Sequence, residues 1–175
     1  MSRLREEQRA LSTRDTQRTK VYAAEQFVRT LFDRAAEHGS RVVDYFGTPL
    51  TLPSEGRFAS VESVQNYVDS VLDHKAVQEH WPNAGRIAVR PRRGVTAAHY
   101  ERRDGDAVIA VPARYARWAL RELVVLHEVA HHLSGATPPH GPEFVAAFCE
   151  LAGMVMGPEV EQVLRVVYSK EGVRG

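Results

Sequence analysis

The sequence predicts an α+β fold, in which a small and mostly antiparallel sheet packs on helices. Three observations predict it. Apolar residues recur with helical spacing near the beginning and through the second half of the 175-residue chain. Between these regions, short apolar runs are separated by turn residues, as in neighbouring antiparallel strands. Hydrophobic residues make up 43% of the chain and charged residues 26%, which is ordinary for a globular protein.

The first part of the chain is expected to alternate between helix and strand. Residues 13–38 have the apolar spacing of a long amphipathic helix, and Gly39 can end it. Residues 42–46 are expected to form a short strand. Ser60 is suited to open a second helix, whose apolar face extends to about His74.

The middle of the chain is expected to supply the sheet. After a turn at residues 81–83, residues 86–90 are expected to form a strand. Residues 97–101 and 107–111 flank a turn that contains glycine, which is typical of a hairpin.

The second half is expected to be helical. From residue 115 onward apolar residues recur every three to four positions, which predicts a long helix. Gly135 can end this helix in the left-handed conformation, and the prolines that follow cannot extend it. Pro142 is suited to the first turn of the next helix, where its missing N–H is not needed.

Two histidines and a glutamate lie in the last turns of the first of these helices. His127 and His131 are four residues apart and share a helical face, so both can bind one zinc ion. His140, on the loop that follows, is expected to be the third ligand. Three protein ligands leave the fourth position of zinc open, which is typical of a catalytic site. Glu128 is expected to be the base that takes a proton from zinc-bound water and delivers it to the leaving group.

Other residues compete for two of these roles. Glu150 or Glu143, on the following helix, could replace His140 as the third ligand, and Glu150 could instead hold a ligand histidine in place. Hydrolysis also requires a donor that stabilises the developing oxyanion, for which Tyr168 and Tyr115 are candidates. For a lone tyrosine, packing is the more ordinary role.

Two motifs together resemble those of the SprT-like (Spartan-type) metallopeptidases: the His-Glu-x-x-His helix and the His-Gly-Pro-Glu-Phe run at residues 140–144. This resemblance covers about residues 115–150. It implies a zincin-like fold, zinc, the histidine of the second motif as third ligand and the glutamate of the first as catalytic base. The linker between the motifs is shorter than in the eukaryotic members, and no zinc-ribbon cysteines follow. The wider chain, through residues 14–15 and 118–128, resembles a small uncharacterised actinobacterial family of metallohydrolases.

The expected order of hairpin, motif helix and ligand loop also resembles the layout of zincin peptidases. In those proteins an edge strand beside the active-site helix holds an extended substrate through main-chain hydrogen bonds. Residues 107–111 are expected to be this edge strand, because they end at Pro112 just before the motif helix.

These expectations predict a zinc-dependent hydrolase, and more narrowly a metallopeptidase that cleaves a polypeptide substrate. Two alternatives stay open. One is a zinc hydrolase of a non-peptide amide, because the same catalytic groups do not choose the substrate. The other is a non-catalytic, zinc-containing module that binds protein or DNA. The glutamate base argues against it, because a purely structural zinc site has no use for a base.

Composition adds limits on partners and location. No apolar run approaches the length of a membrane span, and the N-terminal residues lack the apolar core of a secretory signal, so a cytoplasmic location is expected. Residues 1–12 are expected to be a flexible tail and residues 13–175 a single domain. The lone Cys149 excludes an internal disulfide and is expected to be buried.

Charge gives a weak signal for nucleic acid. The formal net charge of +1 provides no general attraction to phosphate. One stretch is rich in arginine: Arg86, Arg90, Arg92, Arg93, Arg102 and Arg103. A solvated surface is the favoured interpretation of these side chains, so nucleic acid is not favoured as a partner.

Overall fold

The computed structural model describes residues 14–94, 97–112 and 120–175. The expected flexible tail lies outside these residues. The described helices are α2 (Arg18–Glu37), α3 (Val61–Asp73), α4 (Lys75–His80), α5 (Glu122–Ser134), α6 (Pro142–Met156) and α7 (Pro158–Lys170). The described strands are β1 (Val42–Tyr45), β2 (Thr48–Thr51), β3 (Ile87–Arg92), β4 (His99–Arg103) and β5 (Asp106–Pro112). Helices and small sheets in this order confirm the mixed α+β class.

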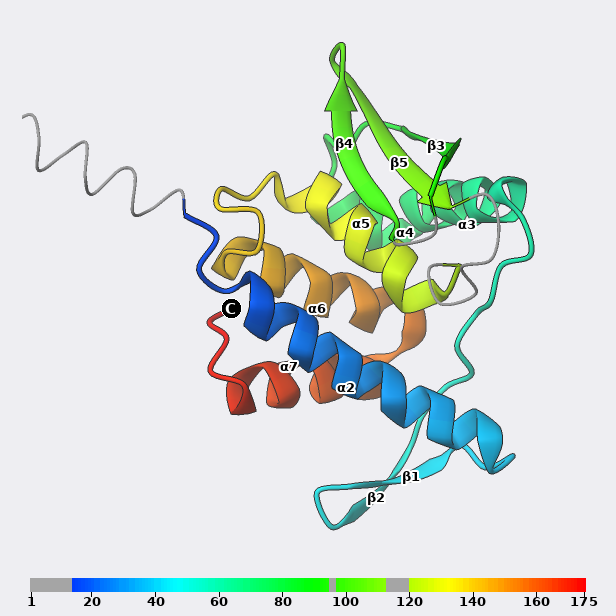
Figure 1. Ribbon diagram of the computed structural model, residues 1–175, viewed down its shortest axis with the longest axis vertical. Coiled ribbons are helices and arrows are strands. Elements are labelled where there is room, and N and C mark those ends of the chain that lie inside the picture. The colour runs from blue at the N-terminus through cyan, green and yellow to red at the C-terminus, as the bar shows by residue number, and fades with distance from the viewer. Residues whose placement is uncertain (1–13, 95–96, 113–119) are drawn as a thin grey trace, which may run out of the picture.

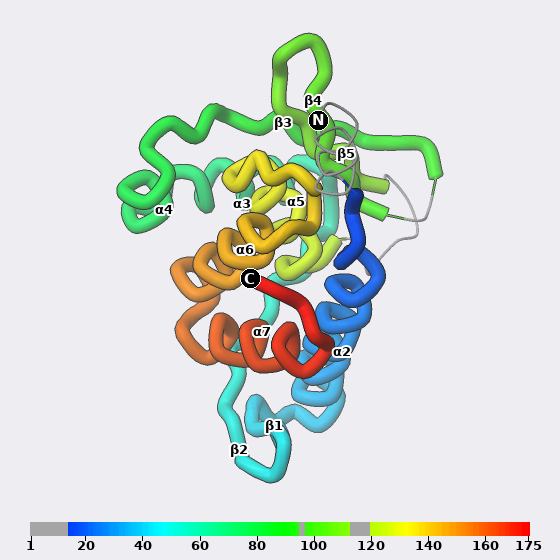
Figure 2. Tube along the Cα trace, turned by 90° about the vertical axis from the view of Figure 1, so that its left-hand side faces the viewer, coloured from blue at the N-terminus to red at the C-terminus, as the bar shows by residue number. Residues whose placement is uncertain are grey.

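Helix α5 lies between a group of helices and the larger sheet (Figure 1). On one side it packs on α6, which packs on α7, and α7 in turn packs on α2. On the other side it contacts β4 and β5, while α3 covers β3. The β1–β2 hairpin projects from the end of the molecule opposite the larger sheet (Figure 2). Buried apolar side chains from all six described helices join in one cluster.

The larger sheet has the strand order β3-β5-β4, in which β5 pairs antiparallel with β4 and parallel with β3. The expectation that residues 107–111 form the edge is therefore wrong, because β5 is the central strand. The physical reason lies in its composition: residues 107–112 are all buried, and a continuous apolar run is best buried between two strands. The more polar β4 takes the edge beside α5.

Two helices begin later than expected. Helix α2 begins at Arg18, because the side chains of Asp15 and Gln17 before it form hydrogen bonds with His140 on the loop after α5. Helix α5 begins at Glu122, and Arg121 is extended and bridges to Arg57. The expected start of this helix, near residue 115, lies outside the described residues. The expectation that the helix runs through Arg121 is wrong.

The remaining helix ends follow the expected capping rules. Ser60 caps α3 by accepting a hydrogen bond from the Ser63 amide. Gly135 ends α5 with φ 54°, and Pro142 occupies the first turn of α6. Within the described residues, no helix combines the length and apolar character that a bilayer crossing requires.

Candidate metal centre

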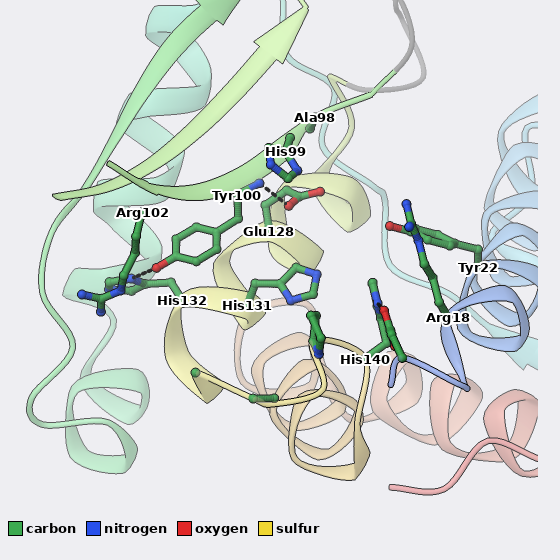
Figure 3. A pocket seen from close by; sticks show the side chains of 14 residues that line it. Arg18, Tyr22, Ala98, His99, Tyr100, Arg102, Glu128, His131, His132 and His140 are labelled. Atoms are coloured by element: carbon green, nitrogen blue, oxygen red, sulfur yellow. Dashed lines mark hydrogen bonds and ion pairs between the residues drawn. The ribbon is translucent and has the colours of Figure 1, made fainter. Parts of the chain in front are cut away.

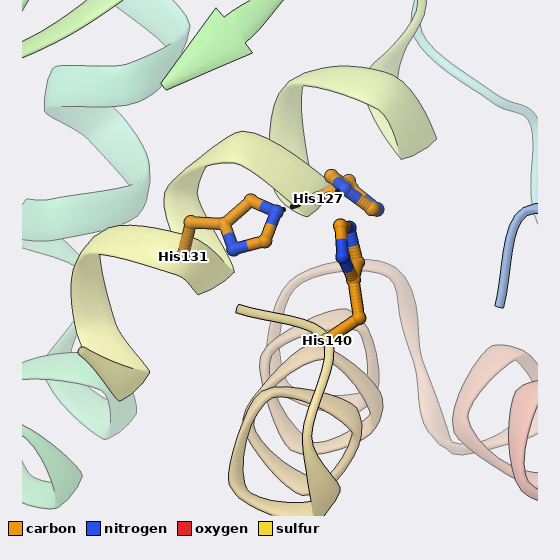
Figure 4. A group of neighbouring side chains, drawn as sticks. All are labelled: His127, His131 and His140. Atoms are coloured by element: carbon orange, nitrogen blue, oxygen red, sulfur yellow. Dashed lines mark hydrogen bonds between the residues drawn. The ribbon is translucent and has the colours of Figure 1, made fainter. Parts of the chain in front are cut away.

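Helix α5 and the loop after it bring His127, His131 and His140 together (Figure 4). One nitrogen of each ring lies within 4.8 Å of the corresponding nitrogens of the other two. The Nε2 atoms of His127 and His131 are 3.1 Å apart. His127 and His140 are buried and His131 is half-buried. Such a group of imidazoles could hold a metal ion.

The loop that carries His140 is held from both ends of the described chain. Its return is set by the left-handed Gly135 and by Pro142 at the start of α6. The Gln17 amide donates to the His140 carbonyl at 3.2 Å and to the Arg174 carbonyl at 3.1 Å, and its oxygen accepts from the Arg174 N–H at 2.7 Å. One side chain therefore ties the start of α2, the ligand loop and the C-terminal segment together.

Two carboxylates orient the rings from outside. The Nδ1 atom of His127 lies 2.9 Å from both oxygens of Glu25, and that of His140 lies 2.7 Å from Asp15. Because a carboxylate only accepts, these Nδ1 atoms carry the proton and their Nε2 atoms are free to bind a metal. The Nε2 atom of His140 is buried and has no hydrogen-bond partner among the described residues. A metal ion would satisfy this atom, so the residues fit the ion.

Burial and neighbouring charges shift the pKa values of these rings and of Glu25. Burial, followed by the neighbouring imidazoles, lowers the pKa of His131 to about 2, so its ring is neutral. Burial opposes the charged forms of both His127 and Glu25, but their mutual attraction outweighs it. The pKa of His127 is consequently raised and that of Glu25 lowered, which keeps Glu25 a carboxylate.

Glu128 lies beside the imidazoles without joining them. Its side chain is buried, and its Oε2 accepts the Tyr100 main-chain N–H of β4 at 2.7 Å. Burial raises the pKa of the Glu128 carboxyl above its ordinary value, because low-dielectric surroundings disfavour the charge. A carboxyl held at the edge of the histidine group is placed to exchange protons with a bound ligand.

A cleft of ≈ 450 Å³ opens over this group between α2 and β4 (Figure 3). Tyr22 of α2 forms one wall, with its ring centroid 5.7 Å from that of His127 and 5.1 Å from that of His140. Its hydroxyl points into the cleft (Figure 3). Burial and the nearby Glu128 charge raise the pKa of Tyr22, so the hydroxyl keeps its proton and can donate. A second cavity of ≈ 410 Å³ continues past Tyr22 and Glu128 along α2.

The competing ligand candidates lie elsewhere. Glu150 contacts His80, with 3.1 Å between Oε2 and Nε2, and Glu143 is exposed. Neither belongs to the histidine group. Tyr168 is only 2% exposed and donates to Glu25 at 2.7 Å, so it supports a carboxylate behind the site and does not face the cleft. Tyr115, the other tyrosine candidate, lies outside the described residues.

Several residues at the site were not predicted from the sequence: Asp15, Gln17, Tyr22, Glu25 and Tyr100. Only Glu25 carries a usable signal, because it is an acid on the apolar face of an amphipathic helix, beside Val21, Ala24 and Val28. A buried charge needs a partner, which Glu25 finds more than a hundred residues away.

Comparison with known proteins leaves the family open. No family model matches the chain, and no curated protein or solved structure is significantly similar to it. The likeness to SprT-like metallopeptidases therefore depends on the motif residues alone.

Proposed function

We propose that this protein is a zinc-dependent hydrolase of zincin type, and more narrowly a metallopeptidase. The observation that carries the proposal is the buried Nε2 of His140, which has no described hydrogen-bond partner and faces two further imidazoles with Glu128 at their edge. Three imidazoles suit zinc and leave a coordination position for a reactant.

Each residue at the site has a distinct task in peptide hydrolysis. Zinc, when bound, activates a water molecule and polarises a carbonyl group. Glu128 accepts the proton of the attacking water and passes it to the leaving nitrogen. Tyr22 donates its hydroxyl to the carbonyl oxygen as negative charge develops there. Glu25 and Asp15 keep the protons of His127 and His140 on Nδ1.

The polypeptide substrate is proposed to bind along β4. Among the described strands, β4 has a neighbour only on its β5 side. The Tyr100 N–H points away from β5, since it reaches Glu128, and strand alternation turns the main-chain groups of Ala98 and Arg102 the same way. All three residues line the cleft. Because the Tyr100 N–H is already used by Glu128, an extended peptide would pair with the main-chain groups of Ala98 and Arg102 and present a carbonyl to the histidine group.

A paired metal and activity measurement tests the proposal. The protein is loaded with one equivalent of zinc, and its hydrolysis of fluorescein-labelled denatured casein is compared with that of small amides. Glu128→Gln should retain one zinc and lose at least about 100-fold in turnover, because the proton acceptor is gone. Glu143→Gln, an exposed glutamate on the next helix, is the matched control and should behave as wild type.

Three results would separate the alternatives. Hydrolysis of small amides without casein cleavage would assign a non-peptide amide hydrolase. A tightly bound zinc with no hydrolysis of either substrate would assign a non-catalytic module. Equal turnover by Glu128→Gln and wild type would remove Glu128 from the mechanism.

A further inference from the structure

The acidic side chains that line the cleft have hydrogen-bond partners, whereas the basic ones have no carboxylate partner among the described residues. Four residues with a formal charge line it: Asp15, Arg18, Arg102 and Glu128. The carboxylate of Asp15 contacts His140, and that of Glu128 accepts the Tyr100 N–H, each at 2.7 Å. Within the described ranges, no carboxylate lies within 4.0 Å of either arginine. The positive charges of the cleft are therefore left without a counter-ion among the described residues.

Of the two arginines, Arg102 is the more available. The Arg18 guanidinium lies over the Tyr22 ring, 5.6 Å from its centroid. Arg102 follows Tyr100 by two residues on β4, so both side chains project from the same face of the strand. Figure 3 shows Arg102 at the end of the cleft beside Tyr100 and His132, away from Tyr22.

The other polar groups at this end are already paired. The Nε2–H of His132 donates to the Gly85 carbonyl at 2.8 Å, and its Nδ1 lies 3.1 Å from the Tyr100 hydroxyl. The cleft is also lined by Gly135, Ala136 and Pro139, whose side chains cannot form hydrogen bonds. An anionic group entering this end would meet the Arg102 guanidinium as its charged partner.

We propose that the cleft selects polypeptides that carry a carboxylate near the bond to be cleaved, and that Arg102 binds this carboxylate. A guanidinium binds a carboxylate through two parallel hydrogen bonds, which gives both affinity and orientation. The carboxylate can belong to an aspartate or glutamate side chain or to the C-terminus of the substrate. This inference rests on the proposed peptidase function and names its substrate class.

The surroundings favour a peptide carboxylate over the phosphates of a nucleic acid. Of the six arginines in residues 86–103, Arg86 pairs with Asp73 at 2.7 Å and Arg90 pairs with Glu101, and Arg102 is the one that lines the cleft. A polynucleotide needs several neighbouring free cations along its backbone. A single guanidinium at the end of a cleft suits one carboxylate better.

Binding to the zinc-loaded Glu128→Gln protein tests the inference without depending on turnover. Fluorescence anisotropy compares three labelled dodecapeptides of alanine and glycine: one with a central glutamate and an amidated C-terminus, one with glutamine and the same amide, and one with glutamine and a free C-terminus. At least one carboxylate peptide should bind about tenfold or more tightly than the neutral peptide. The stronger of the two identifies the source of the carboxylate.

Second substitutions in the same protein assign the preference to a residue. Arg102→Ala should abolish it, and Arg102→Lys should retain part of it because the positive charge remains. Arg103→Ala is the matched control, since Arg103 is the next residue on β4 and does not line the cleft. Zinc content and melting temperature verify that each variant is folded.

Three results would overturn the inference: equal binding of all three peptides, a preference that survives Arg102→Ala, or tighter binding of oligo(dT)12 that Arg102→Ala removes. Failure of the proposed function looks different. Wild-type protein would then cleave none of these peptides, as measured by mass spectrometry, while the Arg102-dependent binding preference could still be present.

Discussion

Glu25 offers a sharp test of how the metal site is held. Its carboxylate is buried and receives the Nδ1–H of His127 at 2.9 Å and the Tyr168 hydroxyl at 2.7 Å. In Glu25→Gln the side chain keeps its size, but one oxygen becomes an NH₂ group that faces donors. The His127 ring then loses its charged acceptor and the orientation that this acceptor imposes.

The expected effect on metal binding follows from that loss. Removing the carboxylate partner of a ligand histidine weakens metal affinity by about 10–100-fold, or about 1.4–2.8 kcal/mol. Tyr168→Phe removes only one of the hydrogen bonds to Glu25, so its loss should be smaller, below about tenfold. Zinc affinity is measured by competition with a chromophoric chelator at fixed pH.

Glu37→Gln is the matched control, because Glu37 is an exposed glutamate at the end of the same helix. Its zinc affinity should equal that of wild type. If Glu25→Gln also binds zinc as tightly as wild type, Glu25 does not orient the ligand and the interpretation of the outer carboxylates is refuted. A loss in Tyr168→Phe larger than that in Glu25→Gln would contradict the order of the contacts.

Three further predictions concern other parts of the molecule. Tyr22→Phe should lower kcat on any cleaved peptide by about 100-fold with zinc content unchanged, because a carbonyl donor is lost; unchanged kcat would exclude that role. Burial raises the pKa of the Cys149 thiol to about 12, so at pH 8 about 10⁻⁴ of it is thiolate. The thiol should therefore react with Ellman's reagent only as the protein unfolds, and stoichiometric reaction within seconds would contradict its burial. Arg121→Ala should lower the free energy of unfolding by about 3 kcal/mol in a guanidinium titration, because the Glu55 side chain, only 4% exposed, keeps just the more distant Arg57 at 3.6 Å as a described ion-pair partner. A loss below about 1 kcal/mol would refute this.

The parts of the site that sequence reasoning predicted are those set by local geometry. A spacing of four residues places two side chains on one helical face whatever the rest of the fold does, so His127 and His131 could be paired in advance. His140 could be predicted as the third member because Gly135 and the prolines after it require the chain to turn immediately after the helix. The structure places all three side chains together.

The parts that sequence reasoning missed depend on contacts between distant segments. Helical spacing could indicate that α2 is amphipathic, but no local rule places Glu25 against a histidine 102 residues later. The prediction of the edge strand was wrong for a similar reason. Proximity to the motif helix suggested that β5 is the edge, whereas its unbroken apolar run required a partner on both sides.

The bridge made by Gln17 has a consequence for how the protein is made in the cell. This side chain connects the loop of His140 to Arg174, in the segment that follows α7. A nascent polypeptide can make that connection only after residue 174 has left the ribosome. Until then the third imidazole lacks this anchor, so the candidate metal site cannot be complete before the segment around Arg174 has been made.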